Sequence, residues 1–412
     1  MKTVSCDVVI VGGGPAGLAA AAELDRQGVE RILVVEREKT AGGILRQCIH
    51  DGFGLTRFGE SLSGPEYAQR FIDEAERRGV QVMTDTTVLE MSADRVLTLV
   101  SGEGLVRVQA RAVILAMGCR ERTRGALAIP GERPAGVFTA GVAQAYMNLY
   151  NRQIGREAVI LGSGDIGMIM ARRLTLEGAH VAGVYEINDA PSGLPRNIRQ
   201  CLDDYGIPLH LRRTITAIHG GARVTGVTVS VVDEAMRPIP GTQEHIPCDT
   251  VILSVGLIPE NELSLGAGVM LDPHTRGALV DEHMQTTCPG VFAAGNVLHV
   301  HDLVDFVSLE AERTAQAVCA YLKDGGLAPC GTPVVCGGNV GYVLPQRVSA
   351  VRDVTLSLRV KRRVNACCIV ARQGGREVMR RRLMKALPAE MIHVTLEAKN
   401  LTAGEEVEVS CE

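Results

Sequence analysis

Apolar and polar positions occur in blocks near the start of the chain, with short apolar runs separated by an amphipathic stretch. Residues 8–11 and 32–35 are uninterrupted runs of β-branched and aliphatic side chains, which is the pattern of strands buried on both faces of a parallel sheet. Residues 18–26, between them, favour a helix that ends near Gly28. The order strand, helix, strand predicts an α/β fold.

The following segment extends this sheet and adds a hairpin. Residues 64–78 predict a second helix, and residues 80–83 predict the next strand. Two β-type runs, 96–100 and 105–109, flank a glycine-containing turn and predict a hairpin. Residues 112–116 predict a separate apolar strand.

A glycine-rich loop joins the first predicted strand to the first helix. Gly12, Gly14 and Gly17 have the spacing G-x-G-x-x-G, and Glu36 follows Gly12 by 24 positions at the end of the next strand. The first glycine makes the turn, the second leaves room for a pyrophosphate, and the third lets helix and sheet pack closely. Free N–H groups at the helix start then meet phosphates, and the Glu accepts hydrogen bonds from an adenosine ribose.

The same loop occurs again 150 positions later in the chain. Gly162, Gly164 and Gly167 repeat the spacing after the apolar run 158–161, and Glu186 again follows the first glycine by 24 positions. Two such cradles predict two dinucleotides, and the pair that makes chemical sense is a bound flavin and a visiting nicotinamide. The alternative for either copy is a buried glycine turn that binds nothing.

Glu186 also indicates which nicotinamide coenzyme is used. A carboxylate at this position accepts a 2′-hydroxyl and repels a 2′-phosphate, whereas binding a phosphate requires a nearby Arg. Residues 187–189 contain no basic side chain. The sequence therefore favours NAD(H) over NADP(H).

The second strand–helix–strand unit is nested within the first along the chain. A β-rich excursion at 214–232 and a return strand at 250–256 follow it, and a helix at 308–322 resumes the first pattern. The sequence predicts two nested Rossmann-like dinucleotide-binding domains plus a small β-rich C-terminal domain. The predicted boundaries are 1–135 and 262–327 for the FAD-binding domain, 136–261 for the NAD(H)-binding domain, and 328–412 for the C-terminal domain.

The segment after residue 328 is strongly basic. Alternating apolar positions at 354–360 and 407–409 predict strands. Twelve Arg and Lys residues between positions 347 and 385 are opposed within that segment only by Asp353 and Glu377. Two interpretations stay open: a solvated face with salt bridges between domains, or a docking surface for an acidic partner subunit.

Composition limits the classes of protein that are possible. The chain has 412 residues, of which 46% are hydrophobic, and a formal net charge of −4, which predicts two or three globular domains and no nucleic-acid partner. Twelve cysteines without a paired framework favour the reducing cytoplasm. No apolar run approaches the ~20 residues of a membrane helix.

Taken together, these motifs resemble a known family. The first glycine loop, Glu36, Gly42-Gly43, and segments 116–118 and 290–296 resemble the two-dinucleotide-binding-domain flavoproteins of the pyridine nucleotide-disulfide oxidoreductase superfamily, in its thioredoxin-reductase-like branch. Segments 42–54, 134–141 and 296–302 are similar to the FAD/NAD(P)-dependent oxidoreductase subunits of anaerobic glycerol-3-phosphate dehydrogenase-type, opine oxidase and cyanide synthase systems.

This resemblance implies tightly bound FAD together with NAD(H). The FAD contacts that it implies are Gly12, Gly14, Pro15, Ala16, Gly17, Glu36, Arg37, Gly43, Val88, Ala116, Gly118, Gly295 and Asn296. The NAD(H) contacts that it implies are Gly162, Gly164, Asp165, Ile166, Gly167 and Glu186. The family usually has Asp where Asn296 stands, and an amide both donates and accepts hydrogen bonds.

The chain departs from the disulfide reductases of this fold, which carry a cysteine pair in one of two places. Cys48 is the only cysteine near Gly42-Gly43, and residues 157–187 contain none. A dithiol relay needs two sulfurs close enough to bridge. The sequence therefore predicts that the protein is not a disulfide reductase.

Several groups lie on segments that this fold brings toward a flavin. Cys48, His50, His299 and His301 are the candidate acid–base groups, since imidazole titrates near neutral pH, with Asp302 and Asp305 on the same segments. The alternative is that these side chains only hold loops. Cys330, Cys336, Cys367 and Cys368 lack the tight spacing of iron–sulfur ligands, so we predict buried thiols and no metal site.

The leading hypothesis is an FAD-dependent NAD(H) oxidoreductase, acting as an electron-transferring subunit of a multi-subunit dehydrogenase of the glycerol-3-phosphate dehydrogenase-associated type. Its partners would be dehydrogenase and iron–sulfur subunits, with peripheral membrane association only through such a complex. One alternative is a self-sufficient FAD dehydrogenase or oxidase of a small amine, amino acid or hydroxy acid. Another is a nucleotide-binding assembly or sensor protein without turnover.

Overall fold

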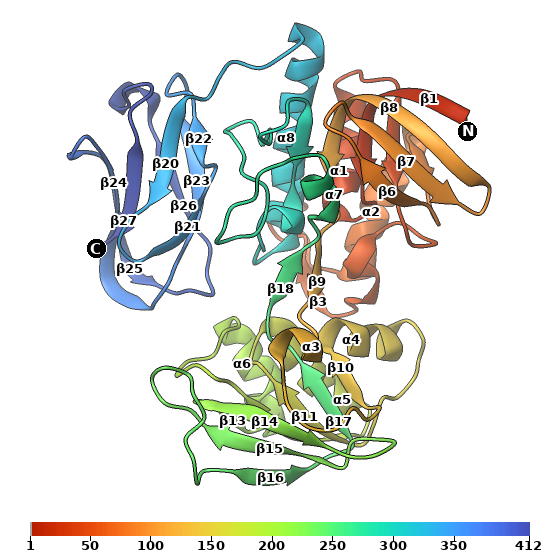
Figure 1. Cartoon of the computed structure of the whole chain (residues 1–412), viewed down its shortest axis with the longest axis vertical. Helices are drawn as coiled ribbons and strands as arrows, with labels where there is room; N and C mark the ends of the chain where they lie inside the picture. Colours follow the sequence, from red (N-terminus) through yellow and green to blue (C-terminus); the bar gives the residue numbers. More distant parts are fainter. Residues whose placement is uncertain (1) are drawn as a thin grey trace. The chain divides into compact units, whose positions relative to one another are not determined.

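The chain forms two units, one of which is inserted in the sequence of the other. In the computed structural model, which describes residues 2–412, unit 1 comprises Met1–Cys119 and Pro259–Glu412, and unit 2 comprises Arg120–Ile258. The chain leaves unit 1 through β9 (Cys119–Glu121) and returns through β18 (Leu257–Pro259) (Figure 1). The predicted α/β class with an added β-rich C-terminal part is confirmed.

A largely parallel sheet forms the centre of unit 1. Its strands lie in the order β5-β2-β1-β8-β7-β6, and β19 pairs with β8. The strands are β1 (Lys2–Val11), β2 (Ile32–Val35), β5 (Gln81–Met83), β6 (Thr87–Met91), β7 (Val96–Ser101), β8 (Gly104–Leu115) and β19 (Val291–Ala293). Val8, Val9 and Ile10 of β1 are completely buried, because β2 and β8 flank them in parallel register and helices cover the sheet.

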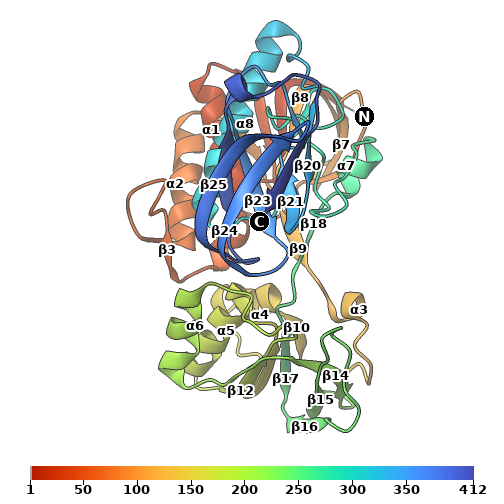
Figure 2. The ribbon, with the colours of Figure 1, turned by 90° about the vertical axis from the view of Figure 1, so that its left-hand side faces the viewer.

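Small side chains let the helices pack closely on this sheet. Helix α1 (Pro15–Arg26) lies against α8 (Val304–Asp324) (Figures 1 and 2), and its Ala19, Ala20, Ala21 and Ala22 are all fully buried. Helix α2 (Gly64–Arg77) begins with a capping box in which Ser63 and Glu66 satisfy each other's backbone N–H groups. The other short elements of this part are η1 (Gly43–Gln47), β3 (Asp51–Phe53), β4 (Leu62–Ser63), α7 (Glu262–Gly266) and η3 (Gly295–Val297).

Unit 2 repeats the same plan on a smaller scale. A five-stranded sheet has the order β10-β17-β11-β12-β13, and a three-stranded sheet has the order β14-β15-β16. The strands are β10 (Val137–Thr139), β11 (Glu157–Leu161), β12 (His180–Tyr185), β13 (Leu209–His210), β14 (Arg213–His219), β15 (Gly226–Val231), β16 (Glu244–Pro247) and β17 (Thr250–Leu253). The helices are α3 (Arg124–Leu127), α4 (Ala140–Asn148), α5 (Asp165–Leu176), α6 (Pro195–Cys201) and the short η2 (Asp203–Tyr205).

The C-terminal part of unit 1 contains two small sheets around their own core. The sheets have the orders β22-β20-β27-β24-β25 and β21-β23-β26, and Figure 2 looks onto β24 and β25. Alternating side chains such as Leu356 and Leu358 are fully buried between the sheets. The elements are β20 (Thr332–Cys336), β21 (Val340–Leu344), β22 (Arg347–Val348), β23 (Val354–Val360), β24 (Val364–Gln373), β25 (Arg376–Ala386), β26 (Ile392–Leu396), η4 (Ala398–Asn400) and β27 (Val407–Cys411).

Some predicted element limits are wrong. The runs 105–109 and 112–116 form one continuous strand, β8, because no turn residue separates them and the strand pairs with β1 along most of its length. The helix predicted at 18–26 begins at Pro15, since proline is well suited to the first helical position. The helix predicted at 308–322 extends over Val304–Asp324. Among residues 2–412, no helix is both long and apolar enough to cross a membrane.

Candidate functional site

The first glycine cradle lies where β1 turns into α1. Gly12 has φ +111°, and a Cβ there would lie 2.4 Å from the carbonyl oxygen of Ala116. A Cβ on Gly17 would lie 1.8 Å from the carbonyl oxygen of Gly12. The backbone requires glycine at both positions, because a larger residue would push the strand and helix apart.

Gly14 has a different role from these two glycines. Its φ of −81° suits any residue, and a Cβ there would meet nothing closer than 3.8 Å, at Gly43 Cα. Gly14 is the N-cap of α1, and no side chain caps the helix there. The protein therefore leaves the helix N-terminus uncovered, which is the arrangement that accepts a phosphate.

Glu36 closes one side of the first cradle. The side chain is buried, its Oε2 accepts the Gly13 N–H at 2.8 Å and its Oε1 accepts the Glu38 N–H at 2.8 Å. A carboxylate has about four acceptor positions, so these two bonds leave about two free for the hydroxyls of a ribose.

The other residues predicted to bind FAD surround this cradle and differ in how exposed they are. Gly43 approaches Gly14 so closely that a Cβ would lie 3.0 Å from Gly14 Cα, and Gly295 approaches Ala16 Cβ to the same distance. Ala116 is buried after β8, and Gly118 has φ +70° with open space around its Cα. Pro15 begins α1, Arg37 is exposed, Val88 is half-buried on β6, and Asn296 follows Gly295 in η3.

The second cradle, in unit 2, has the same backbone shape. Gly162 has φ +95°, and a Cβ there would lie 2.1 Å from the carbonyl oxygen of Ser254. A Cβ on Gly167 would lie 2.7 Å from Ser254 Cβ. Gly164 is the N-cap of α5 and has no side-chain cap. Asp165 begins α5, and its Oδ1 accepts Leu194 N–H at 2.8 Å and Asn197 Nδ2 at 2.6 Å; Ile166 follows, half-buried.

Glu186 differs from Glu36 in how many hydrogen bonds it already accepts. Its Oε2 accepts the N–H and Oγ of Ser163 at 3.0 and 2.6 Å, and Ser192 Oγ at 3.1 Å. Its Oε1 accepts the N–H and Nδ2 of Asn188 at 3.0 and 2.7 Å. Five donors from the protein therefore occupy the roughly four acceptor positions of this carboxylate.

One basic side chain near Glu186 was missed by local sequence reasoning. Arg212, which follows β13, has Nη2 3.6 Å from Asp189 Oδ2, and its N–H donates to the carbonyl of Asn188. The residues directly after Glu186 contain no base, but the fold brings one from further along the chain. Because Arg212 is paired with Asp189, its charge is partly neutralised.

Cys48 and His50 lie on the loop that follows η1. The Cys48 thiol is 3.4 Å from the carbonyl oxygen of Ile44, and burial raises the pKa of this thiol to about 12. The His50 ring packs on Phe53 with centroids 4.9 Å apart, and its Nδ1 is 3.3 Å from the carbonyl oxygen of Asp51. At neutral pH, Cys48 is therefore a thiol rather than a thiolate.

His299 and His301 meet a third residue, Glu310 of α8, which the sequence did not single out. Their Nε2 atoms lie 2.9 and 3.3 Å from the same Glu310 Oε2, while Glu310 Oε1 accepts the Gly295 N–H at 2.8 Å. Burial lowers the pKa of His299. Burial raises the pKa of Glu310, but His301 and His299 outweigh it and bring that pKa well below its usual range.

Asp302 and Asp305 hold loops. Asp305 accepts the N–H groups of Gly54 and Arg57 at 3.2 and 3.0 Å. Asp302 forms an ion pair with Arg359 of β23 and accepts the Met391 N–H at 2.6 Å. Two carboxylates thus join the segment after Gly295 to other parts of unit 1.

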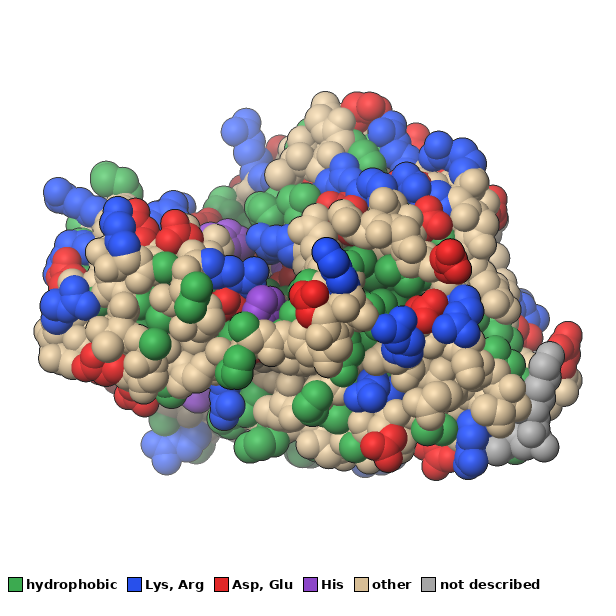
Figure 3. All heavy atoms as spheres, turned by 90° about the horizontal axis from the view of Figure 1, so that it is seen from above, with side chains coloured by type: hydrophobic (Ala, Val, Ile, Leu, Met, Phe, Trp, Pro, Cys, Tyr) green, Lys and Arg blue, Asp and Glu red, His purple; other side chains and the backbone are tan. Residues whose placement is uncertain are grey.

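The basic stretch 347–385 of the C-terminal segment is partly neutralised by acids from outside that stretch. Arg359 pairs with Asp302, Arg352 pairs with Glu282 at 2.8 Å, and Arg372 pairs with Glu412. Exposed basic residues without an ion pair among residues 2–412 include Arg362, Arg363, Arg381, Arg382 and Lys385. On the face in Figure 3, basic side chains are interspersed with acidic and neutral ones.

Among residues 2–412 the cysteines do not group with one another into a cluster site, although Cys330 lies with Glu282 and His283 in a group of possible metal-ligand atoms within 4.8 Å of one another. Each of the twelve, all within residues 2–412, is a thiol. No three of Cys330, Cys336, Cys367 and Cys368 lie within metal-ligand distance of one another among the described residues.

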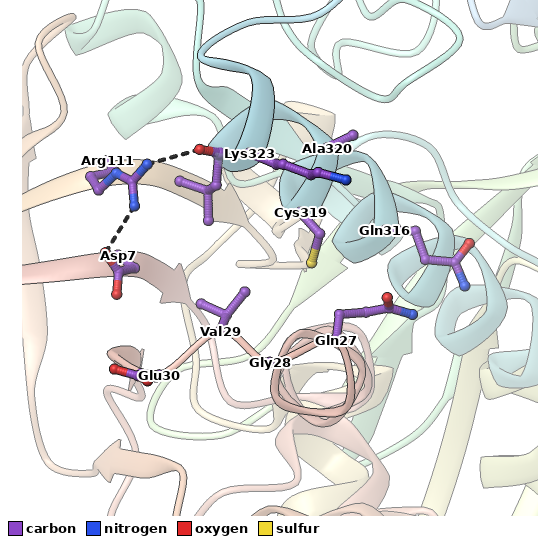
Figure 4. A pocket seen from close by; sticks show the side chains of 11 residues that line it. Asp7, Gln27, Gly28, Val29, Glu30, Arg111, Gln316, Cys319, Ala320 and Lys323 are labelled. Atoms are coloured by element: carbon purple, nitrogen blue, oxygen red, sulfur yellow. Dashed lines mark hydrogen bonds and ion pairs between the residues drawn. The ribbon is translucent and has the colours of Figure 1, made fainter.

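A cavity of about 650 Å³ lies between the C-terminal ends of α1 and α8 (Figure 4). Arg111 bridges Asp7 and the carbonyl of Leu322 there, and the Cys319 thiol points into the space. The cradle, in contrast, lies at the N-terminus of α1 and the carboxyl ends of the parallel strands, where such sheets bind ligands. This cavity is therefore separate from the cradle.

Comparisons with known proteins agree with this architecture. The sequence profile described as "Pyridine nucleotide-disulphide oxidoreductase" matches residues 6–321. Hydrogen cyanide synthase subunit HcnB of Pseudomonas aeruginosa is 27% identical, over 78% of this chain and 72% of its own. An opine oxidase subunit from Agrobacterium tumefaciens is 26% identical, over 70% of this chain and 61% of its own. Thioredoxin reductase of Listeria monocytogenes is 28% identical, over 78% of this chain and 91% of its own.

A solved structure shows the same fold. The T. acidophilum thioredoxin reductase superposes with a TM-score of 0.64 at 24% identity, covering 77% of this chain and 98% of its own. The resemblance to this superfamily and to the cyanide synthase and opine oxidase subunits is thereby confirmed. Enzymes of this family are FAD-dependent oxidoreductases that use a nicotinamide dinucleotide. The chain belongs to the pyridine nucleotide-disulphide oxidoreductase family.

Proposed function

We propose that this chain is an FAD-dependent NAD(H) oxidoreductase that passes electrons between NAD(H) and a partner subunit of a larger dehydrogenase. The observation that carries this proposal is the pair of glycine cradles, each with an uncapped helix N-terminus and a buried Glu. We assign FAD to the first cradle and NAD(H) to the second, within the predicted domains 1–135 plus 262–327 and 136–261.

The assignment of FAD to the first cradle is supported by the free acceptor capacity of Glu36. Its two backbone hydrogen bonds leave room for a ribose. Glu186 supports the choice of NAD(H), since a 2′-phosphate would meet a buried carboxylate, and the two basic side chains after β13, Arg212 and Arg213, already pair with Asp189 and Glu244.

Disulfide reduction is not part of the proposed function, although thioredoxin reductases are among the relatives. A reductase of that kind needs a dithiol, and Cys48 has a strongly raised pKa and no other cysteine near it in sequence. We assign no chemical step to Cys48. His50 remains a candidate acid–base group around the flavin, whereas His299 and His301, which are buried against Glu310, are assigned no proton-transfer step.

A partner subunit is proposed because several relatives are themselves subunits by name. The exposed basic residues of the β24–β25 region, including Arg381, Arg382 and Lys385, offer a surface for an acidic partner. Reversing these three charges should weaken co-purification with native partners and leave reduction of FAD by NADH unchanged.

Anaerobic titration of the purified chain with NADH tests the proposed function. Stoichiometric bleaching of the flavin absorbance is expected, and NADPH should be at least about tenfold less effective at equal concentration. A flavin that NADH does not reduce would contradict the proposal. Fast turnover of a small amine or hydroxy acid without any partner would instead favour a self-sufficient dehydrogenase.

A further inference from the structure

Three buried side chains of unit 1 converge on a single point next to the predicted FAD-binding loop. His299, His301 and Glu310 each offer one ligand atom, and these three atoms all lie within 4.8 Å of one another, with the two Nε2 atoms 2.9 and 3.3 Å from Glu310 Oε2. Side-chain exposure is 1% for His299, 5% for His301 and 3% for Glu310. Two imidazole nitrogens and one carboxylate oxygen form a ligand set typical of zinc sites.

The outer nitrogen of His301 must carry a hydrogen. Asn296 Oδ1 accepts the backbone N–H of His301 at 3.1 Å, and this contact identifies that amide atom as the oxygen. The same oxygen lies 3.4 Å from His301 Nδ1. Because an amide oxygen only accepts, Nδ1 is the donor in this contact, which leaves Nε2 as the nitrogen directed at Glu310.

The outer nitrogen of His299 is in a similar position. Its Nδ1 lies 3.5 Å from the Tyr342 hydroxyl oxygen. That hydroxyl accepts from Arg359 Nε at 3.2 Å and directs its own hydrogen to Met391 Sδ at 3.5 Å. Tyr342 therefore lies within hydrogen-bonding distance of the outer nitrogen of His299, which leaves Nε2 as the nitrogen directed at Glu310.

Three possible metal-ligand atoms thus face one another in a buried place. The two imidazole rings lie with their centroids 4.2 Å apart and face the same carboxylate oxygen. A single divalent cation contacts all three atoms at once. Hydrogen bonds to the outer nitrogens, and from Gly295 to Glu310 Oε1, are the kind of support that orients metal ligands.

We propose that His299, His301 and Glu310 bind one divalent transition-metal cation, with Zn²⁺ the best chemical match. Two imidazoles and a carboxylate suit zinc, and three protein ligands leave a further coordination position. The cation would fasten the loop after Gly295 to α8. Zinc has no accessible redox change, so it would hold the site and would carry no electrons.

Metal counting on the full-length chain tests this site. After removal of metal with a chelator, equilibrium dialysis against Zn²⁺ alone should load about one ion per chain. Glu310→Gln and His299→Gln should lose at least about tenfold in affinity. The matched control is His274→Gln, which alters an exposed histidine 3.8 Å from Asp272 and should bind zinc like the wild type.

Either of two results would overturn the site. One is wild-type protein that retains less than about a tenth of an equivalent of Zn²⁺ after dialysis, which requires no variant to fold. The other is equal zinc binding by Glu310→Gln and the wild type. Bound FAD absorbance serves as the folding check for each variant.

Discussion

The two glycine cradles have the same backbone geometry but treat their acidic residue differently. Glu36 accepts two backbone N–H groups, whereas Glu186 accepts five donors from Ser163, Asn188 and Ser192. A ribose that binds beside Glu36 finds open acceptor positions, and a ribose beside Glu186 must displace a donor. Glu36 thus keeps free acceptor positions for a ligand, whereas the acceptor positions of Glu186 are filled by donors from the protein.

This difference suggests why one dinucleotide stays and the other exchanges. A ligand that fills free acceptors gains hydrogen bonds, whereas one that displaces existing donors gains much less. We infer that the first cradle holds its coenzyme tightly and that the second holds its coenzyme weakly enough to release it in each turnover. We expect the affinities of the two cradles for their coenzymes to differ strongly, although the two backbones have the same geometry.

The strongest test of this difference between the cradles is a matched pair of alanine variants at the middle glycines, Gly14 and Gly164. A methyl group at Gly14 fits the folded protein, with 3.8 Å to its nearest neighbour, and at Gly164 its nearest neighbour is Ser254 Oγ at 3.3 Å. Gly14→Ala should weaken FAD binding at least about a hundredfold, or ~2.7 kcal/mol, because the methyl occupies the place of the pyrophosphate. Gly164→Ala should keep FAD and lose reduction by NADH.

Equilibrium dialysis for FAD and stopped-flow reduction by NADH measure these two effects. Circular dichroism of the apoproteins controls for folding. Gly12→Ala is the contrasting variant, since a methyl there lies 2.4 Å from Ala116 O and should prevent folding of unit 1. FAD binding that survives in Gly14→Ala would show that the first cradle does not hold the pyrophosphate.

Replacing the two glutamates should affect different properties. Glu36→Gln should raise the Kd for FAD about 10- to 100-fold, since it removes acceptors from both the backbone and the ribose, at ~1–3 kcal/mol. Glu186→Gln should change the KM for NADH less than this, but should lower the free energy of unfolding by about 2 kcal/mol, because five donors then share one carbonyl oxygen. Urea unfolding measures the loss of stability, and steady-state kinetics measures the KM for NADH. If the two substitutions weakened FAD binding and NADH binding equally, the proposed difference between the two glutamates would be contradicted.

A smaller effect on coenzyme affinity is expected when one acceptor position of Glu186 in the second cradle is freed. Asn188→Ala removes the Nδ2 donor that lies 2.7 Å from Glu186 Oε1. The apparent affinity for NADH should rise by roughly two- to fivefold, within the ~1 kcal/mol of one hydrogen bond. Ser101→Ala, at the end of β7 in unit 1 and far along the chain from Glu186, is the control and should leave the affinity for NADH unchanged. A weaker affinity for NADH in Asn188→Ala would mean that the amide contacts the coenzyme directly.

The smallest effect is expected at Cys48. Because burial raises the pKa of this thiol to about 12, its thiolate is absent below that pH and becomes available only as pH rises through that value. At pH 8 only roughly one molecule in ten thousand carries the thiolate, against about a quarter for an ordinary cysteine. Cys48→Ser should alter reduction by NADH less than twofold, and alkylation of Cys48 in the native protein should be slow. Rapid alkylation at pH 8 would reopen a role for this thiol.

The backbone part of the architecture was predictable from the sequence because it follows from local rules. Uninterrupted apolar runs at the ends of β1 and β2 require burial on both faces, and the glycine spacing fixes a turn that only glycine allows. The strand β8 was divided wrongly, because Arg111 interrupts the apolar pattern although the strand continues to pair with β1. Apolar periodicity does not distinguish a polar residue inside one long strand from a polar residue between two strands.

The side-chain networks were not predictable, because they join residues far apart in the chain. Glu310 meets His299 only when α8 packs beside η3, and Arg212 meets Asp189 only when β13 joins the sheet beside β12. The basic segment appeared unopposed because its acids, Asp302 and Glu282, come from residues well before it. Local sequence gives the donors and acceptors, but tertiary packing decides their partners.

The insertion of unit 2 has a consequence for the nascent chain. The sheet of unit 1 needs β19 beside β8, and α1 needs α8, so the first 119 residues lack part of their packing until about residue 324 has been synthesised. Unit 2 is contiguous and has all of its strands by Ile258. We therefore expect unit 2 to fold first on the ribosome while the N-terminal segment waits with an open strand edge, the stage at which this protein most needs a chaperone.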